Sequence, residues 1–218
     1  TFGKLLDKKY MHPLLKEMYT NRKAYPIYST FQVAFAVDSP EDAVGAERIW
    51  DCEELVFTKG MGERITVKSY SYEPGFAPQG KQILQTLQGG SEEIYQYWTE
   101  MYKDKERYNN KKREIAELTK KKLEEKFPTY RGKLTILDVW TPMTYRRYCN
   151  AYKGFYQSFM VSKDSAKLPY PPAYIKGINN VILAGQWISP PGGLPGAAIT
   201  GKFAIQRICK LEDKEYLF

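Results

Sequence analysis

The sequence predicts an α+β fold with a mixed, mainly antiparallel sheet flanked by helices. Apolar residues alternate with polar ones over 30–37 and over 64–72, which is typical of strands that bury one face. Between Ser91 and Phe127 the apolar residues instead recur at helical spacing. Near the C-terminus, a short apolar run over 180–184 leads through a glycine-rich loop into another helix.

Length and composition place the chain among folded proteins. It has 218 residues, of which 43% are hydrophobic and 15% aromatic, so it can bury a core without metal or disulfide support and does not resemble a disordered chain. No apolar run approaches the roughly 20 residues that a membrane-spanning helix needs. The first residues lack the apolar stretch and cleavage site of a signal peptide.

The cysteines and the single histidine argue against a metal site. Cys52, Cys149 and Cys209 are odd in number and far apart, which excludes a disulfide framework and a zinc motif and favours a reducing, cytoplasmic setting. His12 stands outside every motif described below, so we assign it no proton-transfer role. The sequence therefore identifies no metal ligand and no catalytic residue.

The formal charge of +8 suggests an anionic partner, but it is unevenly distributed. The segment 103–126 holds ten Lys or Arg residues and six Asp or Glu residues, a mixture typical of a solvated helix face. Six carboxylates would repel a phosphate backbone, so we expect no nucleic-acid partner. Two alternatives stay open: a membrane-surface module that uses the aromatic helix over 94–108, and a basic nucleic-acid-binding module.

Turn and breaker residues set the expected order of elements. The elements expected along the chain are a helix over 4–19 interrupted at Pro13, strands over 30–37, 54–58, 64–72 and 82–88, two helices between 91 and 127 joined near 109–110, a central strand over 133–140, a short helix capped by Thr144 and ending at 148, an extended aromatic segment over 154–159, a polyproline-like segment over 167–172, a buried strand over 180–184 and a helix over 197–210.

The glycine-rich loop is the most informative segment. Gly192, Gly193 and Gly196 allow the backbone to approach a neighbour closely, and Pro195 suits the first turn of a helix. The N–H groups and dipole of that helix end favour negative charge. No G-x-G-x-x-G follows a strand, so the common dinucleotide fingerprint is missing. The loop either contacts part of a ligand or only packs the helix.

Four stretches, in a fixed order, carry a resemblance to a known family. They are Ala77-Pro-Gln-Gly-Lys81, the Lys/Glu-rich run from Lys111 to Pro128, Val139-Trp-Thr-Pro-Met-Thr-Tyr-Arg-Arg-Tyr148 with the following Gly154, and Leu183-Ala-Gly-Gln186 with Gly192-Gly-Leu-Pro-Gly-Ala197. In these stretches the chain resembles the C-terminal half of the FAD-dependent phytoene desaturase, carotenoid isomerase and retinol saturase group, relatives of the amine oxidases.

The resemblance implies a flavin site at the C-terminal strand and helix. Gly185 and Gln186 would lie beside the ribityl or phosphate region of FAD, and N–H groups from Leu194 to Ala197 would face the pyrimidine edge of the ring. A helix N-terminus there stabilises the negative charge of the reduced ring. Many relatives carry an acid near position 186, where this chain has a neutral amide. The implied cofactor-binding residues are Gly185, Gln186, Gly193, Leu194, Pro195, Gly196 and Ala197.

The resemblance also implies the domain organisation and the substrate. Residues 1–175 would form a substrate-binding domain and residues 176–218 the C-terminal piece of an FAD-binding domain. The N-terminal Rossmann unit would be the missing partner, so this chain alone would bind FAD weakly or not at all and would be inactive. The substrate would be an apolar, unsaturated, polyene-like molecule, and the parent enzyme would be cytoplasmic, with peripheral membrane contact conceivable.

Aromatic side chains offer a lining for an apolar cavity in the substrate-binding domain. The alternative is that they pack in the core, as aromatic residues on sheets usually do. The candidates are Phe31, Phe35, Tyr70, Tyr72, Trp140, Phe155, Tyr156 and Phe159.

Overall fold

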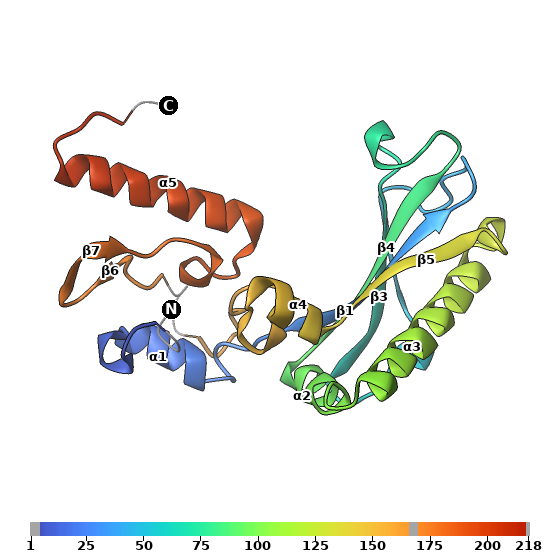
Figure 1. Cartoon of the computed structure of the whole chain (residues 1–218), viewed down its shortest axis with the longest axis horizontal. Helices are drawn as coiled ribbons and strands as arrows, with labels where there is room; N and C mark the ends of the chain where they lie inside the picture. The colour runs from blue at the N-terminus through green and yellow to red at the C-terminus, as the bar shows by residue number, and fades with distance from the viewer. Residues whose placement is uncertain (1–4, 166–169, 217–218) are drawn as a thin grey trace. The chain divides into compact units, whose positions relative to one another are not determined.

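The computed structural model describes residues 5–165 and 170–216, and these divide into two compact units. The first, which we call the sheet unit, is Tyr28–Tyr156 (Figure 1). The second unit combines Thr1–Ile27 with Gln157–Phe218. This division does not coincide with the boundary predicted at residue 175. Residues 157–175 and the N-terminal segment group with the C-terminal elements rather than with the sheet.

The sheet unit is a five-stranded antiparallel sheet with helices against one face, which confirms the α+β prediction (Figure 1). The strand order is β2-β3-β4-β1-β5, and every neighbouring pair is antiparallel. The elements are β1 (Ser29–Val37), β2 (Glu47–Asp51), β3 (Met61–Ser69), β4 (Gln82–Gly90), α2 (Glu92–Met101), α3 (Lys105–Lys126), β5 (Leu134–Trp140) and α4 (Pro142–Cys149).

The alternation predicted for β1 is confirmed. Phe31, Val33, Phe35 and Val37 are all buried in the main core, together with residues of α2 and α3 such as Trp98. Since side chains of a strand alternate between faces, one row of β1 supplies this core and the other row lies on the opposite face.

The opposite face of the sheet carries a chain of side-chain hydrogen bonds. Tyr70 donates through its hydroxyl to Gln85 Oε1 at 2.6 Å, and Gln85 Nε2 donates to Gln32 Oε1 at 2.6 Å. Gln32 Nε2 in turn donates to the Tyr145 hydroxyl at 2.6 Å, and that hydroxyl lies 3.0 Å from Thr30 Oγ1. These bonds satisfy the buried amide of Gln32 and connect α4 to β1.

Tyr145 makes the stability of this network depend on pH. Burial raises the pKa of Tyr145 to about 12 from 10, so folding favours the neutral phenol. Its contribution is therefore complete below pH 10 and is lost as the pH rises toward 12. We expect Tyr145→Phe to flatten the decline of the unfolding free energy over this window, as measured by urea denaturation at stepped pH. Tyr148→Phe, at an exposed ring, serves as the control, and an unchanged slope in Tyr145→Phe would contradict the assignment.

Two strand predictions were wrong, and both concern the edges of the sheet, β2 and β5. The segment 54–58 is not a strand; it begins within a short 3₁₀ helix, Glu53–Leu55. The strand lies at Glu47–Asp51, where charged and exposed residues hide the alternation, as is common at sheet edges. The strand β5 was predicted to be central, but it pairs only with β1 and forms the other edge.

The join between the two helices lies earlier than predicted. Asn109 and Asn110 are inside α3, on its exposed side, where helix-unfavourable residues are tolerated. The chain turns at 102–104, and the carboxylate of Asp104 accepts hydrogen bonds from the N–H groups of Glu106 and Arg107 at 3.0 and 3.1 Å. This N-cap explains where α3 begins.

The second unit contains α1 (Pro13–Thr20), a hairpin of β6 (Tyr174–Ile175) and β7 (Ile178–Ile182), and α5 (Gly193–Leu211). Pro13 begins α1 rather than interrupting a longer helix, and His12 Nδ1 caps it by accepting from the Leu14 N–H at 3.2 Å. The first part of the predicted helix, residue 4, lies outside the described residues.

Three further predictions for the C-terminal half differ from the structure. The segment 154–159 is not extended throughout: Gly154 ends a short 3₁₀ helix, Tyr152–Gly154, and the chain bends over 156–158. Residues 167–169 of the polyproline-like segment lie outside the described residues. The strand β7 is mostly exposed rather than buried. The last helix begins at Gly193, four residues earlier than expected, because Gly192 already stands at the N-cap.

Candidate functional site

The seven predicted cofactor-binding residues all lie in one connection of the second unit. The chain leaves β7, bends at Gly185 with φ 109°, and passes through a short 3₁₀ helix, Gln186–Ile188. It then crosses a cis Pro190–Pro191 bond and reaches Gly192, the N-cap of α5. The first turn of α5 supplies residues 193–197. The strand, loop and helix predicted from the sequence therefore form one continuous element.

Thr200 holds the start of this connection against α5. Its Oγ1 accepts the Gly185 N–H at 2.9 Å and lies 3.3 Å from the Gly185 carbonyl oxygen. The same hydroxyl is 3.0 Å from the Gly196 carbonyl and 2.9 Å from that of Ala197. Thr200 is not among the cofactor-binding residues predicted from the sequence. A hydroxyl four residues after Gly196 was the signal, because Ser and Thr bond backbone carbonyls in that position.

Thr200→Val is therefore expected to destabilise the second unit. Valine keeps the shape of the side chain but leaves the Gly185 N–H without its acceptor, which costs about 1–2 kcal/mol. Thr200→Ser retains the hydroxyl and should lose less. Chemical denaturation of the three proteins, followed by circular dichroism, measures the difference. Equal losses for valine and serine would show that the methyl packing, not the hydroxyl, stabilises the loop.

Gln186 closes the N-terminus of α5. Its Oε1 accepts the Gly193 N–H at 3.1 Å, which is the role of a capping side chain that Gly192 cannot play. Its Nε2 has no hydrogen-bond partner among the described residues and can donate to a ligand oxygen. A carboxylate at this position would accept the same N–H but would have no donor to offer.

The glycines of the loop have different physical roles. A Cβ at Gly192 would lie 2.8 Å from Ser158 Cβ and 3.0 Å from Gln186 Cβ, so this glycine is required by packing within the unit. At Gly185 a Cβ would meet no atom within 4 Å, and at Gly193 only Pro195 at 3.8 Å. Both residues have positive φ. Gly185 and Gly193 thus leave open space beside the backbone.

Few backbone donors remain in the first turn of α5. Pro195 has no N–H, and the Gly193 N–H is bonded to Gln186. The N–H groups of Gly196 and Ala197 are directed along the helix, toward the carbonyls of residues 192 and 193. Among the described residues, no hydrogen bond is found for the Leu194 N–H. A ligand at this helix end would therefore be offered one main-chain donor, that of Leu194.

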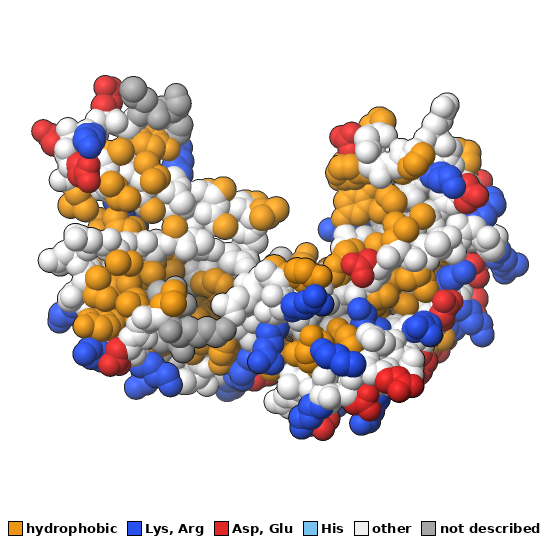
Figure 2. Space-filling model, in the orientation of Figure 1, with side chains coloured by type: hydrophobic (Ala, Val, Ile, Leu, Met, Phe, Trp, Pro, Cys, Tyr) orange, Lys and Arg blue, Asp and Glu red, His pale blue; other side chains and the backbone are white. Residues whose placement is uncertain are grey.

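The helix α5 exposes most of its large apolar side chains. Ala204 is its only fully buried residue among those described, while the Leu194 side chain is 88% exposed. Figure 2 shows hydrophobic side chains along α5 on the face viewed. The exposed apolar residues of this helix, which we call the α5 apolar surface, are Leu194, Ile199, Phe203, Ile205, Ile208 and Leu211. Each of them is at least 39% exposed.

The aromatic candidates divide between core and surface. Phe31, Phe35, Phe155 and Phe159 are buried, so they pack in the interior as the alternative reading held. Tyr70 belongs to the hydrogen-bonded chain on the opposite face of the sheet. The remaining candidates, Tyr72, Trp140 and Tyr156, are partly or largely exposed.

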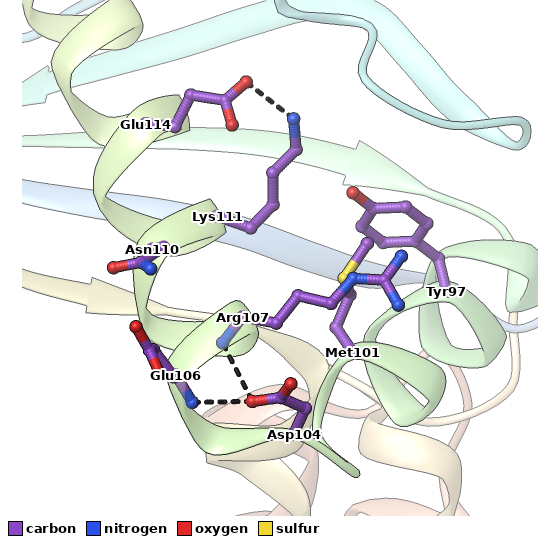
Figure 3. A pocket seen from close by; sticks show the side chains of 8 residues that line it. All are labelled: Tyr97, Met101, Asp104, Glu106, Arg107, Asn110, Lys111 and Glu114. Carbon is purple, nitrogen blue, oxygen red and sulfur yellow. Dashed lines mark hydrogen bonds and ion pairs between the residues drawn. The ribbon is translucent and has the colours of Figure 1, made fainter.

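A polar pocket of about 500 Å³ lies between α2 and α3 (Figure 3). Two of its acidic groups already have partners: Asp104 accepts backbone N–H groups as the N-cap of α3, and Glu114 Oε1 lies 2.6 Å from Lys111 Nζ. Arg107 extends toward Tyr97 (Figure 3), and among the described residues no carboxylate lies within ion-pair distance of its guanidinium group. Acids and bases alternate around the opening, so nothing in this pocket favours a ligand of one charge.

The mixed-charge reading of α3 agrees with its ion pairs. Lys122 Nζ lies 2.8 Å from Glu54 and 2.9 Å from Glu125, and basic and acidic side chains are interspersed over the helix in Figure 2. The described residues contain no cluster of His, Cys, Asp or Glu suited to a metal ion. None of the helices in the described ranges combines the length and apolar character needed to cross a bilayer.

No protein-family model matches this chain, and a search of the curated proteins finds no match.

Proposed function

We propose that the chain is the C-terminal half of an FAD-dependent oxidoreductase that acts on an apolar, unsaturated substrate. The observation that carries the proposal is the connection from β7 to α5. There, two glycines of positive φ leave the backbone open, and a helix begins with one unpaired main-chain donor. FAD, when bound, would supply the hydride- or electron-accepting chemistry.

The residues around the start of α5 can contact different parts of FAD at the same time. Gly185 and Gly193 allow close approach, Gln186 Nε2 can donate to a ribityl hydroxyl or phosphate oxygen, and the Leu194 N–H can donate to an anionic ring edge. Thr200 Oγ1 accepts the Gly185 N–H and so holds Gly185 against α5. Pro195, Gly196 and Ala197 contribute the helix start rather than individual donors.

The α5 apolar surface supports the proposal that this chain is one half of a larger enzyme. Surfaces of this kind on a folded chain usually mark contact with another protein surface. In the proposed enzyme, the N-terminal FAD-binding half covers α5 and supplies the dinucleotide fingerprint that the chain lacks. The isolated chain would then bind FAD weakly or not at all.

Part of the aromatic segment on which the membrane alternative depended is buried, while Tyr95, Tyr97 and Tyr102 are partly exposed. Ile94, Trp98 and Tyr108 are buried in the main core, where they hold α2 and α3 against the sheet. Neither they nor the interspersed charges of α3 favour a membrane or nucleic-acid module over the flavoenzyme.

Leu194 offers a direct test in the protein expressed from the full coding sequence that contains this chain. Leu194→Pro removes the N–H at a position near the helix start where proline is tolerated, and Leu194→Ala keeps the N–H while removing the same apolar side chain. We expect the flavin reduction potential to be more negative in Leu194→Pro than in Leu194→Ala. Equal potentials in flavin-containing proteins, or no flavin in the unsubstituted protein, would contradict the proposal.

A further inference from the structure

A separate cavity of about 330 Å³ lies in the sheet unit between α3, α4 and the end of β5. Lys105, Asn109 and Lys112 line it from α3, and their spacing of four and three residues places them on one face of that helix. Thr144 and Arg147 line it from α4, three residues apart and again on one face. Two facing helices thus direct the same kinds of side chain into one space.

The lining is mainly cationic. Lys105, Lys112 and Arg147 contribute three positive charges, and Asp138 contributes the one carboxylate. Asp138 Oδ1 accepts the N–H of Val139 at 2.7 Å, so part of its hydrogen-bonding capacity is used by its own strand. The cavity therefore differs from the rest of α3, where acids and bases are interspersed.

None of the three cations has a carboxylate within ion-pair distance among the described residues. Lys105 Nζ instead lies 3.0 Å from the centre of the Tyr102 ring, and Arg147 Cζ lies 5.1 Å from that of Tyr148. Lys112 Nζ is 5.4 Å from the Tyr108 ring. Ring contacts leave the N–H donors of these groups available to an anion.

Some lysines of the same helix are paired: Lys111 with Glu114 at 2.6 Å and Lys122 with Glu54 at 2.8 Å. Other cations of α3 outside the cavity, such as Arg107 and Lys126, have no ion pair among the described residues. The cavity is therefore distinguished by three cations that line one space from two helices.

Two side chains that line the cavity have shifted pKa values. Burial lowers the pKa of Lys112, against an opposing effect of Asp138, so its charge lacks full solvation and would gain from an anion nearby. A hydrogen bond from Lys105, aided by the charges of Arg147 and Arg146, lowers the pKa of Tyr102. The same field that favours a phenolate would favour a bound anion.

We propose that this cavity binds a phosphate group, carried either by a small phosphate ester or by the headgroup of an anionic lipid. Lys105 and Arg147 reach it from the two helices, and the planar guanidinium can bind two phosphate oxygens at once. Thr144 Oγ1 accepts the Thr141 N–H at 3.1 Å, which fixes this side chain in the lining.

Charge favours phosphate over a simple carboxylate. Three cations and one carboxylate leave two positive charges, which match a phosphate monoester near neutral pH. The volume admits one phosphate with a small organic group, not an extended polyanion. The carboxylates spread along α3 still argue against a nucleic-acid backbone. This site is in the sheet unit, so it does not depend on the proposed flavin site.

The first test is isothermal titration of inorganic phosphate into the purified chain at constant ionic strength. We expect saturable binding at one site, and we expect the Lys105→Gln/Arg147→Gln variant to raise the dissociation constant about tenfold or more. Arg113→Gln/Lys121→Gln is the matched control: it removes two exposed charges from α3 outside the cavity and should bind as the unsubstituted protein does. Circular dichroism establishes that both variants are folded.

A second experiment distinguishes the two sources of phosphate. The chain is sedimented with phosphatidylcholine vesicles and with phosphatidylcholine vesicles that contain phosphatidic acid. Co-sedimentation with the second kind only, lost in Lys105→Gln/Arg147→Gln, identifies a lipid headgroup; saturable phosphate binding without co-sedimentation identifies a small ester. The proposal is overturned if phosphate does not bind saturably, or if both double variants weaken its binding equally.

Discussion

Gly154→Ala is expected to destabilise the sheet unit by about 3 kcal/mol or more, through overpacking and an unfavourable backbone conformation together. Gly154 has φ +62°, which alanine adopts with strain. A Cβ there would also lie 2.7 Å from the carbonyl carbon of Pro142 and closer still to its oxygen. These are backbone atoms at the start of α4, so the helix itself must move. Urea denaturation measures the loss of unfolding free energy.

Gly132→Ala is the matched control for this substitution. Gly132 also has positive φ, at +71°, but a Cβ there would meet nothing within 4 Å. It should therefore cost only the conformational strain, about 1 kcal/mol. If the two substitutions destabilised the protein equally, strain alone would account for both, and close packing of Gly154 on α4 would be refuted. A large difference would explain physically why a glycine follows the Thr-Pro segment of α4.

Trp98→Ala is expected to cost about 3–5 kcal/mol, the range for large aromatic truncations in a core. The Trp98 side chain is fully buried on α2. Its ring stacks on Phe31 of β1, with centroids 5.7 Å apart and planes 7° from parallel, and meets Tyr108 of α3 edge-on at 5.6 Å. One side chain thus joins the sheet to both helices. Thermal and urea unfolding should both report the loss.

Trp98→Phe separates volume from the indole N–H. Among the described residues, the buried Trp98 Nε1 has no hydrogen-bond partner, so phenylalanine removes a costly donor while losing part of the packing. We expect it to cost less than half as much as Trp98→Ala. A phenylalanine variant as unstable as the alanine variant would mean that the full indole shape, and not aromatic packing in general, holds the helices on the sheet.

Periodicity predicted the elements that bury one face. Phe31, Val33, Phe35 and Val37 alternate and lie in the core, as the pattern indicated. The pattern failed where burial does not impose it. The strand β2 is exposed and charged, so it carries no alternation, and two asparagines in α3 looked like a break although exposed helix positions tolerate them. Strand order also lay beyond the sequence, because β5 reads as apolar on both faces yet forms an edge.

In the candidate site, too, the sequence predicted some features and not others. The sequence identified the glycine-rich entry to α5 and, through a resemblance, the residues around it. It did not identify the contact of Ser158 with Gly192, since these residues are distant in sequence and meet only in the folded unit. Nor did it show that the Gln186 side chain binds the Gly193 N–H, which leaves Leu194 as the main-chain donor of that turn. Such roles depend on distances that spacing alone does not determine.

The flavin content of the protein expressed from the full coding sequence that contains this chain tests the central claim most directly. The protein is purified without added cofactor, denatured, and its released flavin quantified against protein concentration. The account predicts one FAD per polypeptide in that protein and substoichiometric or no FAD in the 218-residue chain prepared in the same way. A full-length protein that contains no flavin would contradict the account.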